Sequence, residues 1–131
     1  MREILFRGKR LDNGDFIIGD LRRGKTGKAA VYWDVLKMYM DVDPETVGQY
    51  TGLTDKNGRK IFEGDIIHGL FLFCMPIEAV VTFQDGAFGL EWQWGDARRF
   101  SAFTSICNVT YEIVGNIHDN PELLKGGAFD G

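Results

Sequence analysis

Apolar and polar side chains alternate along most of the chain with a period of two, which is the pattern of strands with one buried face. In the opening segment Ile4 and Phe6 fall on one side and Leu5 on the other. Asn13-Gly14 follows, and Asn-Gly tolerates the positive φ angles of a tight hairpin turn. The pattern therefore predicts a first hairpin whose return strand covers residues 16–21.

Similar runs predict the remaining strands, which are expected over residues 29–33, 35–42, 66–68, 79–83, 88–92 and 111–118. Asp43 before Pro44 is typical of a turn or of one helical turn, and Gly64-Asp65 predicts a turn that opens the strand at 66–68. Asn120 before Pro121 predicts a short helix through Lys125. Residues 97–110 mix helical spacing with β-branched side chains, so their structure stays open.

Short strands with turns about every ten residues predict a mainly β fold. We expect antiparallel strands that form a strongly bent sheet or small barrel, with minor helix. A length of 131 residues suits one compact domain, or two small β-subdomains that share a core.

The N-terminal segment lacks the apolar stretch of a signal peptide, and no run is long enough to span a membrane. We therefore expect a cytoplasmic protein without a membrane partner. Its two cysteines, Cys74 and Cys107, are typical of free buried thiols in a reducing compartment and are too few for a zinc site.

The net charge is −4, which argues against a general nucleic-acid binder because attraction to phosphates requires a positive field. The charge is uneven, however. Residues 1–28 hold eight Lys and Arg against four Asp and Glu, whereas the rest hold seven against fifteen. This is either an ordinary mixed surface or a basic N-terminal face that meets an acidic face of a neighbouring subunit.

Three stretches, in this order along the chain, resemble the YopX family: REILFR (residues 2–7), VDPETVGQYTGL (42–53) running on to GDII (64–67), and VGNIHDNPEL (114–123). The resemblance implies a protein of phages and prophages with no assigned activity, no catalytic residue and no cofactor. It also implies a β-rich (α+β) N-terminal subdomain over residues 1–60, an SH3-like barrel over 61–125 and a flexible tail over 126–131. Assembly into a homo-oligomer, such as a hexamer, is expected from it as well.

His68 and His118 are the only histidines. If their strands were neighbours, with Asp65 or Asp119 nearby, they would form a metal site, and a metal-dependent hydrolase is one hypothesis. The other interpretation is that both are surface or structural residues. The sequence shows no nucleophile next to a recognisable base, so we expect no enzyme.

The Gly-rich, basic segment 22–28 looks superficially like a phosphate loop, but Gly24 and Gly27 are too close together and a strand follows. An exposed hairpin loop is the expected structure. Weak binding of a nucleic-acid backbone is the alternative, through a binding module that uses the basic loop.

Trp92 and Trp94 share one face if residues 90–94 are extended, either in the core or at an interface. The candidate interaction surface consists of Arg22, Arg23, Lys25, Lys28, Trp92 and Trp94. The first hypothesis is a non-catalytic oligomeric interaction or accessory protein of a phage, in the host cytoplasm, with another host or phage protein as a further partner.

Overall fold

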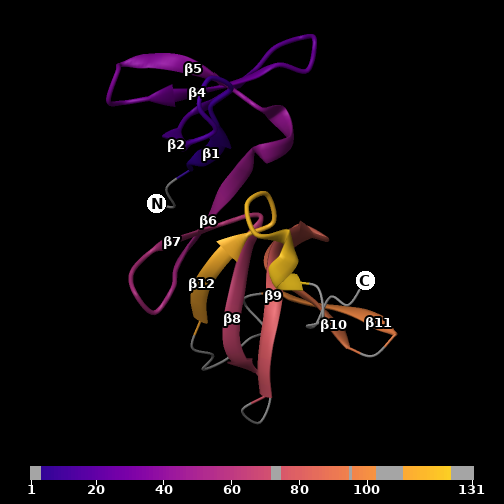
Figure 1. Cartoon of the computed structure of the whole chain (residues 1–131). Helices are drawn as coiled ribbons and strands as arrows, with labels where there is room; N and C mark the ends of the chain where they lie inside the picture. Colours follow the sequence, from indigo (N-terminus) through magenta and orange to yellow (C-terminus); the bar gives the residue numbers. More distant parts are fainter. Residues whose placement is uncertain (1–3, 72–74, 95, 103–110, 125–131) are drawn as a thin grey trace. The chain divides into compact units, whose positions relative to one another are not determined.

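The computed structural model describes residues 4–71, 75–94, 96–102 and 111–124 (Figure 1). The chain divides into two compact units, Met1–Gly52 and Leu53–Gly131. Each unit is described by itself below.

The first unit consists of short strands and one 3₁₀ turn. They are β1 (Phe6–Lys9), β2 (Phe16–Gly19), β3 (Leu21–Arg23), β4 (Ala29–Trp33), β5 (Met38–Val42), η1 (Pro44–Thr46) and the beginning of β6 (Gly48–Thr54). β1 pairs with β2 and with β6 in antiparallel fashion, while β3, β4 and β5 form a separate sheet in that order. Figure 1 shows β4 and β5 in purple as one extended hairpin.

The core of the first unit lies between β2 and the inner face of the β3–β4–β5 sheet. It is formed by Ile17, Ala29, Val31 and Val42, with Leu21, Trp33, Met40 and Val47 packed around them. β2 passes so close to β4 that a Cβ on Gly19 would lie 1.9 Å from the carbonyl oxygen of Tyr32. Only glycine fits at this position.

The predicted helical turn at Pro44 is confirmed. The Asp43 carboxylate accepts the backbone N–H of Glu45, which is the bond of an N-cap residue. The Thr46 hydroxyl donates to the Asp43 carbonyl at 2.7 Å and accepts the backbone N–H of Lys9 at 2.9 Å. One buried side chain therefore ties η1 to β1.

The second unit continues from β6 into one large sheet. Its elements are β7 (Lys60–Phe62), β8 (Asp65–Phe71), β9 (Met75–Gln84), β10 (Ala87–Trp94), β11 (Ala97–Ala102), β12 (Tyr111–Asn116) and the 3₁₀ turn η3 (Pro121–Leu124). Five of these described strands form a curled antiparallel sheet in the order β11-β10-β9-β8-β12, and β7 lies next to β6. Its most deeply buried side chains include Ile61, Ile66, Ile67, Val81 and Leu90.

A buried turn leads from β7 into β8. Gly64 has a φ of 93°, donates its N–H to Val81 and accepts the N–H of Ile117. The Asp65 carboxylate accepts the N–H of Phe62 at 2.8 Å in a buried position. Gly64-Asp65 is thus a structural turn, as the sequence predicts.

The mainly β fold with bent antiparallel sheets is confirmed, and several strand boundaries differ from the expected ones, most clearly in the first unit. The return strand of the first hairpin ends at Gly19, and Arg22 and Arg23 lie in β3 rather than in a loop. The strand expected over residues 35–42 begins at Met38, after a turn. These differences arise because pairing with β4 decides where β3 and β5 begin, and that pairing is not local in sequence.

Other expectations meet the structure only in part. Residues 97–102, left open by the sequence, form β11, and the short helix at Pro121 is a 3₁₀ turn. Residues 103–110, the tail 126–131, Cys74 and Cys107 lie outside the described residues. The SH3-like barrel stays a prediction. No helix in the described part of the chain is long and apolar enough to cross a membrane.

Candidate functional site

On the β3–β4–β5 sheet, an arginine lies over one ring of a pair of tyrosines. Tyr32 on β4 is directly opposite Tyr39 on β5, and their rings meet edge to face with centroids 5.3 Å apart. The Arg22 guanidinium carbon is 4.1 Å from the centroid of Tyr39, which is close for a cation–π contact. Both rings are half-buried, whereas Arg22 is exposed.

The register places these residues on the outer face of the sheet. Arg22 is opposite Ala30, and Ala30 is two positions from Tyr32, so all three side chains share a face. Lys28, which precedes β4 by one residue, falls on the same face by alternation. Val31 points the other way, into the core. We call the set Arg22, Lys28, Tyr32 and Tyr39 the Arg22–Tyr39 face.

The four basic residues of the candidate interaction surface carry uncompensated charge. Arg22, Arg23, Lys25 and Lys28 are all exposed. Among the residues that the structure describes, none of the four forms an ion pair. Their charges are therefore available to an external anion.

Lys37 differs from these four, because it donates to the Asp34 carboxylate at 2.8 Å. This hydrogen bond, together with the charge of Asp34, raises the pKa of Lys37. Lys37 is thus a locally paired cation on the turn between β4 and β5.

Other cations of the first unit also lie over aromatic rings. Arg10 is 4.8 Å from the ring centroid of Trp33 and also forms an ion pair with Asp12 at 2.6 Å. Arg7 is 4.5 Å from the ring centroid of Phe16. Arg7 and Arg10 are thus in contact with side chains of their own unit. Among the described residues up to position 28, the exposed Lys and Arg side chains all lie in residues 22–28.

The two candidate tryptophans belong to the second unit. Trp92 is in the second unit and only 6% exposed, so it is a core residue there. The backbone of Trp94 ends β10, but its side chain lies outside the described residues. The sequence did not single out Tyr32 and Tyr39, because only the register of β4 and β5 places them opposite each other.

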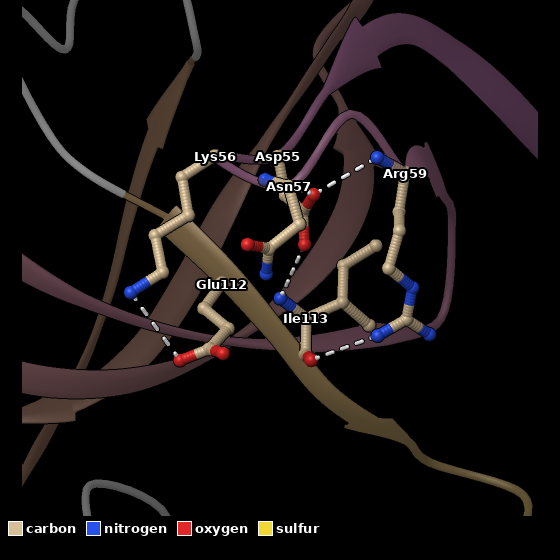
Figure 2. A network of polar contacts seen from close by, with 6 residues as sticks. All are labelled: Asp55, Lys56, Asn57, Arg59, Glu112 and Ile113. Carbon is tan, nitrogen blue, oxygen red and sulfur yellow. Dashed lines mark hydrogen bonds and ion pairs between the residues drawn. The ribbon is translucent and has the colours of Figure 1, made fainter.

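A second polar cluster connects the turn after β6 to β12 (Figure 2). The buried Asp55 carboxylate accepts the backbone N–H groups of Asn57 and Arg59, both at 2.9 Å. Its second oxygen accepts the N–H of Ile113 at 3.0 Å. The Arg59 side chain donates to the carbonyl of Ile113 at 3.4 Å, and Lys56 is 3.6 Å from Glu112.

These bonds close the outer edge of β12. Ile113 is opposite Ile67 on β8. In an antiparallel pair, a residue either bonds its partner with both backbone groups or directs both away from it. Since the N–H and C=O of Ile113 bond Asp55 and Arg59, both groups point away from β8. The two side chains therefore replace a neighbouring strand.

The Asp55 carboxylate accepts three backbone N–H groups, which makes it a structural and not a reactive carboxylate. Burial raises the pKa of Asp55, but the hydrogen bonds from Ile113, Arg59 and Asn57 and the charge of Arg59 outweigh burial and lower it below its ordinary value. A carboxylate held in its ionised form by three N–H groups is a poor proton acceptor.

His68 and His118 lie on different elements of the second unit. His68 on β8 is opposite Glu78 on β9 and Glu112 on β12, and its Nδ1 is 3.5 Å from Glu78. His118 follows β12 in a turn, where its N–H bonds the Asn116 side chain. No group of three or more potential metal-ligating side chains is found in the described part of the chain.

Comparison with known protein families finds a match that covers most of the chain. The model of the family described as YopX protein matches residues 9–125. No curated protein matches the chain.

Proposed function

Because the chain belongs to the YopX family, we propose that it is a non-catalytic oligomeric interaction or accessory protein, encoded by a phage or prophage and acting in the host cytoplasm. The observation that supports this proposal is the exposed, uncompensated charge of Arg22, Arg23, Lys25 and Lys28. Such a surface attracts an anionic partner.

A second copy of the chain is an anionic partner of this kind. Residues 53–131 hold six Lys and Arg against eleven Asp and Glu, so this half of the sequence is acidic. A basic loop that meets an acidic face of the next copy makes a head-to-tail contact, and such contacts close into rings when the rotation allows. A hexamer is one such ring.

Light scattering after size-exclusion chromatography tests this proposal. We expect a particle of several 14.8 kDa subunits that dissociates as salt is added. The double variant Arg22→Glu/Arg23→Glu should dissociate at lower salt than wild type, and Lys37→Ala, which removes a paired cation, is the matched control. A monomer at high protein concentration and low salt would contradict the proposal.

The second candidate function is a nucleic-acid-associated module that uses the basic loop 22–28. It is favoured by the contact of Arg22 with the half-buried ring of Tyr39, because arginine next to an accessible ring is typical of nucleic-acid surfaces. It predicts binding that weakens steeply with added salt. Absence of binding at about 50 mM salt, where phosphate contacts are strong, would rule it out.

A further inference from the structure

We propose that the Arg22–Tyr39 face binds single-stranded nucleic acid, with bases stacked on the face and phosphates held by the basic loop. This inference rests on the second candidate function and adds the class of ligand and the way it is held. The rings and the guanidinium that would contact the bases lie on the outer face of the β3–β4–β5 sheet.

The face provides flat groups for stacking. Tyr32 and Tyr39 form a pair of half-buried rings, and the Arg22 guanidinium covers one ring at 4.1 Å. A guanidinium plane has two faces, and because Arg22 is exposed its outer face is open to solvent. Nucleobases stack on tyrosine rings and on guanidinium planes alike. A base placed here would pack on the open side of the guanidinium.

The loop next to the rings provides the charge. Lys28 lies on the same face as Arg22, and Lys25 is exposed in the loop between them, whereas Arg23 is opposite the buried Ala29 and alternates to the other face. Three phosphate contacts to a single strand predict that the logarithm of the binding constant falls with the logarithm of salt with a slope of about −2.

The combination favours a single strand over the other anionic partners. In a duplex the flat faces of the bases are covered by their neighbours, so the rings would contribute nothing. An acidic peptide would pair with the cations of this face but has no obligatory flat group for the tyrosines. A single strand uses both features of the face.

Fluorescence anisotropy with a short oligothymidine tests the inference. Three ligands of equal charge separate stacking from charge: the oligothymidine, an abasic oligonucleotide of the same length, and an acidic peptide. We expect the oligothymidine to bind at least about tenfold more tightly than the abasic strand, since each stacked base contributes on this scale.

Two single-charge variants locate the site. Arg22→Ala should weaken oligothymidine binding by about tenfold or more and reduce the salt slope by about 0.7. Lys37→Ala removes one cation of the same hairpin sheet, but a cation that Asp34 already pairs, and should change the affinity by less than about twofold. Circular dichroism shows whether both variants keep the wild-type fold.

The outcomes separate the inference from the function on which it rests. Equal affinity for oligothymidine and the abasic strand overturns the stacking inference but leaves a charge-based nucleic-acid module. Binding to neither strand overturns both. Preference for the acidic peptide overturns both as well, and supports a protein partner. Equal effects of Arg22→Ala and Lys37→Ala overturn the location of the site.

Discussion

The Asp55 carboxylate accepts the N–H of Ile113, a residue 58 positions away in the sequence, at 3.0 Å. Arg59, from the same turn, reaches the carbonyl of the same residue. An edge strand with unpaired N–H and C=O groups is a template for pairing with other chains. Asp55 and Arg59 occupy both groups of Ile113, so this part of β12 offers no such template.

We expect Asp55→Asn to lower the free energy of unfolding by about 1–3 kcal/mol, because one buried N–H loses its charged acceptor. Urea unfolding of purified variants measures the change. Asp85→Asn is the matched control. Asp85 is exposed in a turn with a φ of 50°, a conformation that asparagine tolerates, so this variant should stay near wild type. Equal stability of the two variants would show that the Asp55 bonds contribute nothing.

The same carboxylate predicts an acid-sensitive contribution to stability. Its pKa in the folded state is lowered from the ordinary 3.8. The stabilisation is therefore complete above that value and is lost as the pH falls below it towards the folded-state pKa. Unfolding midpoints of wild type and Asp55→Asn, measured from neutral pH down to about pH 3, should converge on the acid side. A difference that stays constant over this range would contradict the prediction.

Gly19→Ala should destabilise the first unit by at least about 1–3 kcal/mol, because the added Cβ would lie 1.9 Å from the Tyr32 carbonyl oxygen and force β2 away from β4. Gly24→Ala is a suitable comparison, since its nearest neighbour is the Cβ of Lys28 at 3.8 Å and its backbone has no positive φ. Thermal unfolding of both variants should show a loss for the first and little change, within about 0.5 kcal/mol, for the second.

Thr46→Val should cost about 1–2 kcal/mol although valine has nearly the same shape. The substitution removes the hydroxyl that accepts the N–H of Lys9 and donates to Asp43. Thr26→Val is the control, because it makes the same chemical change in the exposed loop between β3 and β4, where the hydroxyl forms no such bonds with the described residues. Urea unfolding compares the two, and equal losses would show that the bonds of Thr46 are not the cause.

The sequence predicted the features that depend on neighbouring residues. Asn13-Gly14 marks the first hairpin turn, and Gly14 indeed has a positive φ of 77°. Asp43 before Pro44 marks η1, and Gly64-Asp65 marks the turn before β8. Each of these signals lies within a few positions of the structure that it specifies, so alternation and turn chemistry were sufficient.

Features that depend on distant residues were not predictable in this way. Nothing local joins Asp55 to Ile113, and Arg22 belongs to a strand only because Ala30 pairs with it. The pairing of Tyr32 with Tyr39 requires the register of β4 and β5, which the sequence does not state. Whether Trp92 was a core or a surface residue was likewise open, and its packing in the second unit decided it.

The tryptophans give the two units separate optical signals. Trp33 is the only tryptophan in the sequence of the first unit, where Arg10 lies over its ring, and the second unit holds the buried Trp92 together with Trp94. Trp33→Phe would therefore leave an emission spectrum that reports on the second unit alone. Wild type and this variant, followed in the same denaturant series, would reveal whether one half of the molecule melts before the other.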